Sequence, residues 1–396
     1  MDRAELVELL SPQGLSLLDS LPEWHSDDDV VRTVSDLRKA GHSPALVAAV
    51  LNQSKLRTKA RAKFGEFADR MLFTEPGLEQ ATRLRVAALH AGRFARAGIR
   101  HVADLGCGIG GDALALSAIG LEVTAADADE VTAAIATFNL APFEKTRVVH
   151  SLAEDVHLGG IDGVWLDPAR RVASGGRTRR LADPADYTPS LDFAFGVGAE
   201  RATGVKLGPG TDRTLIPAEA EAQWISVDGD VVELGVWFGA VRRPAIGRAA
   251  LVIRGDEAHE LTAPADSADA EIGPLGEYLA EPDGAVIRAR LIGELAAGHD
   301  ARMLSDGIAY LTADRPIESP FSRGFRVLER LPAEERRLRM ALAERGIGTL
   351  EIKKRGADVD PAALRTRLRL KGDERATLVL TRESGKHVAL LVERLD

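Results

Sequence analysis

The chain has 396 residues, a formal charge of −9 at pH 7, 45% hydrophobic residues and 28% charged residues. This composition is ordinary for a globular protein of several domains, and no apolar run is long enough to span a membrane. The single cysteine, Cys107, excludes a disulfide framework and a zinc site built on cysteines, and the nine histidines show no metal-ligand spacing. From these cysteine and histidine patterns we expect no bound metal. The acidic N-terminus is unlike a signal peptide, so we expect a cytoplasmic protein.

The charge is distributed unevenly along the chain. Residues 255–287 contain nine acids and no lysine or arginine, so the charge of this stretch, −9, equals the net charge of the whole chain. Basic residues gather in three clusters, at 52–64, at 170–180 and at 353–375. Each cluster is either solvated surface or a contact for a polyanion, and three clusters on separate parts of the chain favour the polyanion.

The first 70 residues are rich in helix formers and predict a helical region. Strand and helix patterns then alternate, which indicates a parallel sheet with helices on both faces. The predicted strands are 101–106, 121–127, 147–155, 163–170 and 204–210, and the predicted helices are 110–120, 129–141 and 191–200. Residues 223–238 break this rhythm as a hairpin around Asp228-Gly229-Asp230, and 248–255 is a further strand.

The remaining chain predicts two more parts. Residues 263–284 read as an acidic surface connector, followed by a helix at 285–298 and a strand at 308–314. The tail predicts a small α+β module with a hairpin around Ser384-Gly385. We therefore expect an α/β protein with a Rossmann-like sheet and an antiparallel edge hairpin, in four parts: 1–70, 71–262, 263–330 and 331–396.

A glycine-rich loop follows the first predicted strand. Gly106, Gly108 and Gly110 let a ligand approach the backbone, and Asp127, at the end of the second strand, can accept both ribose hydroxyls. Gly106, Gly108 and Gly111 also fit the G-x-G-x-x-G of nicotinamide enzymes. Asp104 disfavours a pyrophosphate there and suits the cationic end of S-adenosylmethionine, so we favour that cofactor.

The motifs DLGCGIGGD, AADAD, AED and LDPAR resemble those of class I S-adenosylmethionine-dependent methyltransferases, over about residues 70–260. MLFTEPGLEQAT is similar to the segment before the first strand in trimethylguanosine-synthase-like RNA methyltransferases. The tail resembles the THUMP-like domain that follows such domains in bacteria. The resemblance implies a Rossmann-like fold and a set of cofactor-binding residues: Asp104, Gly106, Cys107, Gly108, Gly110, Asp127, Ala128 and Asp155.

Asp167 and Pro168 are the expected catalytic residues. Many base-amino methyltransferases carry Asp/Asn-Pro-Pro and an aromatic residue here, where the acid holds the amine and the ring stacks on a flipped base. This chain has Arg170 at the aromatic position, so stacking comes from elsewhere or is absent; the candidates are Trp165, Phe73 and Tyr187. A C5-uridine mechanism needs a nucleophilic cysteine, and Cys107 lies in the cofactor loop.

An arginine cluster directly follows the Asp167 turn and is expected to contact substrate phosphates: Arg170, Arg171, Arg177, Arg179 and Arg180. The leading hypothesis is an RNA base methyltransferase acting on tRNA or rRNA, with the THUMP-like tail helping to bind RNA. Two alternatives remain open: a small-molecule or protein methyltransferase, and a non-catalytic binding protein that keeps the cofactor fold.

Overall fold

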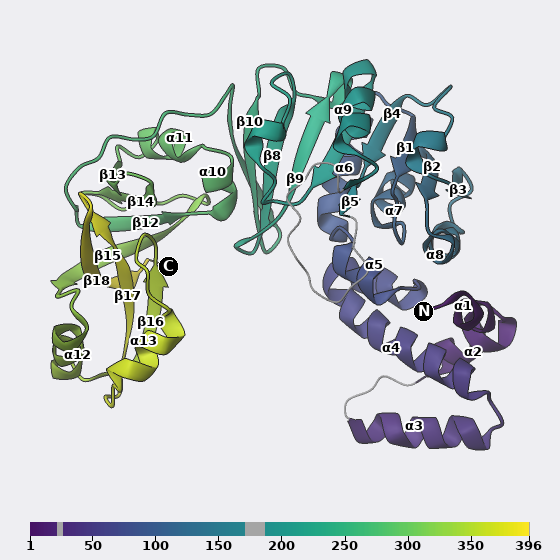
Figure 1. Cartoon of the computed structure of the whole chain (residues 1–396), viewed down its shortest axis with the longest axis horizontal. Coiled ribbons are helices and arrows are strands. Elements are labelled where there is room, and N and C mark those ends of the chain that lie inside the picture. The colour runs from purple at the N-terminus through teal and green to yellow at the C-terminus, as the bar shows by residue number, and fades with distance from the viewer. Residues whose placement is uncertain (22–26, 171–186, 396) are drawn as a thin grey trace. The chain divides into compact units, whose positions relative to one another are not determined.

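The computed structural model describes residues 1–21, 27–170 and 187–395, apart from the side chains of 27–29 and 169–170. The chain forms two compact units (Figure 1). The first comprises Met1–Lys206 and Trp237–Arg242, and the second comprises Leu207–Val236 and Arg243–Asp396. The boundary between the units therefore falls inside the predicted 71–262 part, after Lys206.

The first unit begins with the expected helices. They are α1 (Arg3–Leu9), α2 (Pro12–Ser20), α3 (Asp27–Lys39) and α4 (Pro44–Phe64), and a 3₁₀ turn (Gly65–Arg70), α5 (Glu75–Gln80) and α6 (Leu84–Arg96) follow. Ser11 and Ser43 cap α2 and α4, and each is followed by a proline at the first helical position. Such caps satisfy the first free N–H groups, which explains why the helices begin there.

A nine-stranded sheet follows, in the order β11-β10-β8-β9-β7-β4-β1-β2-β3. The central strands β1, β2, β3, β4 and β7 pair in parallel. This confirms the predicted α/β fold. The strands are β1 (His101–Leu105), β2 (Glu122–Asp127), β3 (Thr146–His150), β4 (Gly163–Leu166), β7 (Ala202–Leu207), β8 (Glu221–Val227), β9 (Asp230–Phe238), β10 (Arg248–Arg254) and β11 (Glu257–Ala263); the helices are α7 (Gly111–Ala118), α8 (Glu130–Leu140) and α9 (Leu191–Glu200).

Two short strands, β5 (Ala169–Arg170) and β6 (Tyr187–Thr188), pair with each other after β4. The predicted hairpin at the sheet edge is present between β8 and β9. Asp228 and Gly229 have φ of 54° and 98°, the left-handed pair that a two-residue turn requires. Strand β11, which pairs antiparallel with β10, was not predicted.

The second unit contains a seven-stranded sheet in the order β13-β14-β12-β15-β18-β17-β16. Helices α12 and α13 pack on its C-terminal strands through a leucine-rich cluster (Figure 1). The elements are β12 (Tyr278–Pro282), α10 (Gly284–Arg288), α11 (Ile292–Ala297), β13 (Arg302–Ser305), β14 (Ile308–Ala313), β15 (Ser322–Leu331), α12 (Glu335–Glu344), β16 (Ile347–Lys354), α13 (Pro361–Leu368), β17 (Glu374–Glu383) and β18 (Lys386–Arg394).

Two expectations for this unit differ from the structure. The predicted connector 263–284 contains β12, which lies inside the sheet and fully buries Leu279 and Ala280. The predicted helix 285–298 is split into α10 and α11, because Arg290 between them adopts a left-handed φ of 59° that no α-helix continues through. The tail sheet is therefore larger than the predicted module.

Four of the nine acids of the stretch 255–287 pair with basic side chains of the second unit. Glu260 contacts Arg243, Asp266 contacts Arg213 and Arg248, and Asp269 contacts Arg290. Glu281 accepts a hydrogen bond from Lys353 at 2.6 Å. Part of the negative charge is thus neutralised locally, so the stretch is not the uniformly repelling surface that its composition indicates.

Candidate active site

A cavity of 490 Å³ lies in the first unit at the carboxyl ends of β1, β2 and β4. Its lining includes five carboxylates and, among the described residues, no lysine, arginine or histidine side chain. The five acids are Asp112, Asp127, Asp129, Glu154 and Asp167. Such a lining repels a pyrophosphate and attracts a cation, because charges interact strongly where water is partly excluded.

The glycine loop forms one wall of this cavity. Gly106, Cys107 and Gly108 line it, whereas Gly110 lies at the N-terminus of α7 and does not. Gly106 has a φ of 80°, and a Cβ there would lie 2.9 Å from the carbonyl oxygen of Asp167. Only glycine fits this position, because both the backbone conformation and the close approach exclude a side chain. The Cys107 thiol is buried, which raises its pKa well above the ordinary value.

Asp127 holds the same loop from the end of β2. Its carboxylate accepts the N–H of Gly108 and the N–H of Asp129, both at 2.9 Å. Burial raises the pKa of Asp127 and outweighs these two donors, which lower it. Asp127 and Ala128 both line the cavity, as the ribose-side prediction requires. Of the neighbouring acids after β3, Glu154 lines the cavity and Asp155 does not.

Two further acids lie beside the loop, and their pKa values are shifted in opposite directions. Asp104 is 1% exposed, does not line the cavity, and its side-chain oxygens accept no hydrogen bond from the described residues. Burial raises the pKa of Asp104 well above its ordinary value, and the neighbouring Asp112 and Asp167 add to this. Its predicted contact with the cationic end of a cofactor stays a prediction.

Asp112 is the acid of this pair whose pKa is lowered, and it was not predicted as a site residue. Its carboxylate accepts a hydrogen bond from Thr82 at 2.7 Å and lies 2.9 Å from the His90 ring nitrogen. Burial alone would raise the pKa of Asp112, but these partners hold it below the ordinary value. The sequence signal was weak, because Asp112 resembles an ordinary acid in the first turn of a helix.

Asp167, the predicted catalytic acid, lines the cavity just after β4. Its Oδ2 lies 2.5 Å from Nζ of Lys206, near the end of β7, which also donates to the carbonyl of Gln80. Sequence analysis did not single out Lys206, because nothing local connects two residues 39 positions apart. Pro168 does not line the cavity, and only the backbone of Arg170 is described, in β5. Arg171, Arg177, Arg179 and Arg180 lie outside the described residues.

None of the proposed stacking residues lines the cavity. Trp165 is 1% exposed and packs on His90 and Trp237, with ring centroids 4.4 and 5.4 Å away. Phe73 is fully buried, and Tyr187 is 5% exposed. The cavity lining contains no aromatic side chain among the described residues, so these three rings serve the core.

The N-terminal region supplies the opposite wall, which was not predicted. Thr74, Gly77 and Gln80 line the cavity from the segment around α5. This segment is held by side-chain amides: Gln53 exchanges two hydrogen bonds with the backbone of Phe73, at 2.7 and 2.9 Å. Asn139 of α8 does the same for Leu72, at 2.8 and 3.0 Å. The segment is thereby fixed to both α4 and α8.

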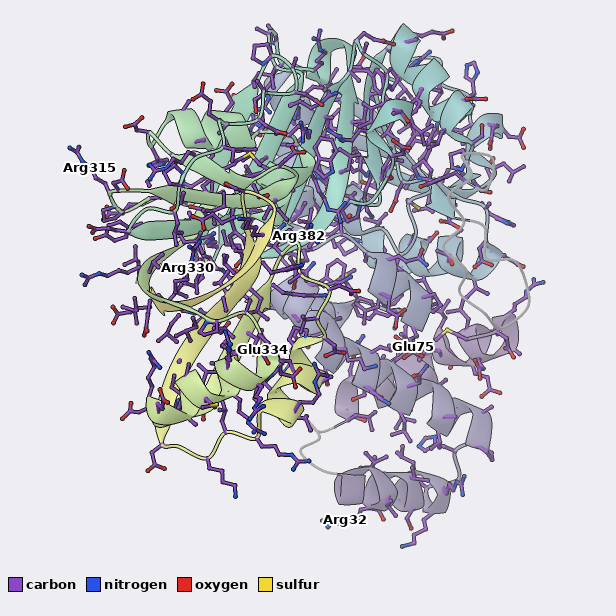
Figure 2. The ribbon with its side chains drawn as sticks, turned by 60° about the vertical axis from the view of Figure 1, so that its left-hand side comes forward. Arg32, Glu75, Arg315, Arg330, Glu334 and Arg382 are labelled. Atoms are coloured by element: carbon purple, nitrogen blue, oxygen red, sulfur yellow. The ribbon has the colours of Figure 1, made fainter. Side chains whose placement is uncertain are left out.

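The basic cluster 52–64 on α4 also serves this wall. Lys63 donates to the carbonyls of Leu78, Glu79 and Ala81 at 2.7–2.8 Å, and burial lowers its pKa to about 8. Other members pair with acids of the first unit: Arg57 with Asp19, Arg61 with Asp69 and Lys59 with Glu75, which is labelled in Figure 2. Four of its five basic side chains therefore have partners within the protein, and Lys59 and Arg61 remain about half exposed in their ion pairs.

Within the described part of the chain, no group of three or more potential ligands could hold a metal ion. No described helix is long and apolar enough to cross a membrane.

Comparison with known proteins agrees with this geometry. Uncharacterized S-adenosylmethionine-dependent methyltransferases from two strains of Mycobacterium tuberculosis are 35% identical over 359 residues, which cover 87% of this chain and 94% of each relative. The chain belongs to the S-adenosylmethionine-dependent methyltransferases. Residues 322–394 match the THUMP domain-like family, and residues 2–60 match a domain of unknown function, DUF8688. A crystal structure of a Porphyromonas gingivalis W83 protein, described as a methyltransferase, shares the fold over both full chains, with a TM-score of 0.74 and 21% identity.

The residues of this methyltransferase fit its cofactor. S-Adenosylmethionine carries an ammonium and a sulfonium and no phosphate, so it suits a cavity lined by five carboxylates and no cationic side chain of the described residues. A side chain at Gly106 would collide with the carbonyl oxygen of Asp167 and displace the loop that lines the cavity. Asp127 lines the cavity beside the loop, and its contact with a ribose diol stays a prediction.

Proposed function

We propose that this methyltransferase methylates a base in RNA, with tRNA or rRNA as the substrate. The observation that carries the proposal is the combination of a cofactor cavity containing Asp167 with a THUMP domain-like match at 322–394. The match supports an RNA substrate, because the tail then supplies a binding surface that a small-molecule enzyme does not need.

The tail carries the charge that such a surface requires. Five basic residues from the end of β16 to the start of β17 are exposed and form no ion pair with the residues that the structure describes: Lys354, Arg365, Arg369, Lys371 and Arg375. Phosphate contacts from such residues provide affinity that is independent of base sequence. The predicted contacts of Arg170, Arg171, Arg177, Arg179 and Arg180 with substrate phosphates remain part of this proposal.

In this proposal one set of cavity residues binds the cofactor, and Asp167 positions the nucleophile. The bound cofactor supplies an electrophilic methyl group on its sulfonium. Asp127 and Ala128 hold the ribose side, Glu154 or the predicted Asp155 holds the adenine amine, and Asp112 attracts the ammonium. Asp167 accepts a hydrogen bond from the N–H of the nucleophile and so directs its lone pair. Lys206 holds the Asp167 carboxylate in one orientation, and Pro168 stiffens the turn.

The deciding experiment is methyl transfer from labelled cofactor to total RNA, protein and metabolite fractions, followed by nucleoside analysis. We expect label in RNA, and we expect Asp167→Ala, which removes the hydrogen-bond acceptor, to abolish it. Asp162→Ala is the matched control, because Asp162 also follows a turn in the sheet but lies before β4 and binds the N–H groups of Arg100 and His101. Label in protein or metabolites alone would refute the RNA proposal, and no label in any fraction would favour a non-catalytic binding protein.

A further inference from the structure

A second cavity, of 340 Å³, lies entirely within the second unit. It is lined by the start of β15, the loop before it, the last residue of β10 and the end of β18. Three arginines contribute to the lining: Arg254, Arg323 and Arg394. No activity described above uses this cavity.

Two of the arginines have no carboxylate partner among the described residues. Arg254 makes only two long hydrogen bonds, of 3.4 and 3.5 Å, to the carbonyl of Ser322, beyond the usual range of about 2.7–3.2 Å. Arg323 lies across the sheet from Glu281, but Glu281 is bonded by Lys353 instead. Arg394, in contrast, pairs with Glu351 at 2.6 Å. Arg254 and Arg323 thus form no ion pair with the described residues, and the carboxylate of Glu318 is the acid that shares the cavity lining with them.

A third polar group of the lining is also unsatisfied. Ser322 is 4% exposed, and its hydroxyl has no hydrogen-bond partner among the described residues. Burying a hydroxyl without a partner is costly, so such a group generally marks a ligand or an ordered water. The weakly held Arg254 covers the backbone of Ser322, and a move of Arg254 toward a ligand would open this residue. The acid in the lining, Glu318, is exposed and free to turn away.

We propose that this cavity binds a phosphodiester group of the RNA backbone through Arg254 and Arg323. A guanidinium group matches a phosphate with two parallel N–H donors, and the hydroxyl of Ser322 adds a further donor. The site lies at the beginning of the THUMP domain-like match, so it would anchor RNA on the second unit independently of the cofactor cavity. The assignment of this phosphate to RNA rests on the proposed function. The inference that the cavity binds a phosphate group does not depend on it.

The first test measures the binding of inorganic phosphate to the full-length protein by thermal shift and calorimetry. We expect Arg254→Gln with Arg323→Gln to weaken phosphate binding by about tenfold or more. Glu318→Gln should strengthen it, because a repelling carboxylate is removed. The matched control is Arg315→Gln in the adjoining loop: Arg315 is exposed, points away from the ribbon (Figure 2) and does not line the cavity. Equal binding by wild type and the double variant, or no binding by wild type, would overturn the site.

The second arm measures RNA affinity across a salt series. Loss of one phosphate contact should lower the magnitude of the log–log slope by about 0.7 on single strands, while cofactor affinity stays unchanged. If the double variant binds phosphate weakly but RNA normally, the anion site stands and its assignment to RNA is wrong. If wild type methylates RNA and the double variant binds both ligands normally, the proposed function stands and this inference fails.

Discussion

Replacing Asp127 with asparagine should weaken S-adenosylmethionine binding and leave the fold intact. The wild-type carboxylate accepts two backbone N–H groups at 2.9 Å and lines the cavity. Asparagine keeps one acceptor oxygen, but its NH₂ group cannot accept from the backbone or from a ribose hydroxyl. A lost charge-assisted hydrogen bond costs about 1.5–3 kcal/mol, which corresponds to about a 10- to 150-fold increase in Kd.

Isothermal calorimetry with the cofactor and with its demethylated product measures this change. Because the pKa of Asp127 is raised, wild-type affinity should fall as the pH is lowered, beginning above the pH at which an ordinary aspartate protonates. The Asp127→Asn variant should lack this pH dependence. Asp162→Asn is the control, since Asp162 also accepts two backbone N–H groups, at the opposite ends of the strands. Cofactor affinity within threefold of wild type in Asp127→Asn would refute the assignment.

Three further predictions concern the surroundings of the cavity. Lys206→Met should destabilise the protein by about 1–2 kcal/mol in thermal unfolding, since it removes the partly buried ion pair between Lys206 and Asp167; an unchanged melting point would contradict this. Gly106→Ala should abolish cofactor binding, whereas Gly120→Ala, with a similar φ of 89° and open space around it, should cost stability alone. Folded Asp104 binds its proton more tightly than unfolded Asp104, so stability should fall as pH rises above 3.8, and Asp104→Asn should flatten that fall in a pH series of unfolding curves.

Local patterns account for the parts of the fold that were predicted correctly. The alternation of apolar strands and amphipathic helices predicted β1, β2, β3, β4 and β7, but not the short pair β5 and β6. Asp228-Gly229 and Ser384-Gly385 predicted their hairpins, since left-handed turns require such residues. Strand β12 was missed because proline, glycine and acids surround it, although its neighbours in the sheet bury it. Tertiary contacts overrode local preference there.

In the candidate site, too, local sequence patterns predicted some features, whereas others arise only from contacts between distant segments. The glycine loop and Asp127 lie close together in sequence, and the cavity contains them. The Lys206–Asp167 pair and the Thr82–Asp112 bond join residues 39 and 30 positions apart, so no local pattern could reveal them. The basic cluster on α4 was ambiguous for a related reason: its acidic and carbonyl partners lie on other segments, and only the fold brings them together.

The paired hydrogen bonds from the side-chain amides of Gln53 and Asn139 to the backbone of Phe73 and Leu72 have a consequence for hydrogen exchange. The backbone N–H groups of Leu72 and Phe73 belong to no helix or strand, yet each donates to a buried side-chain oxygen. Their deuterium uptake should therefore be as slow as that of a central strand, because release requires α4 or α8 to separate from the segment. Cofactor binding should slow it further, since the same segment continues into the cavity wall at Thr74. Two amides in an irregular segment would thus report both the folding of the N-terminal helices and the occupancy of the cofactor site.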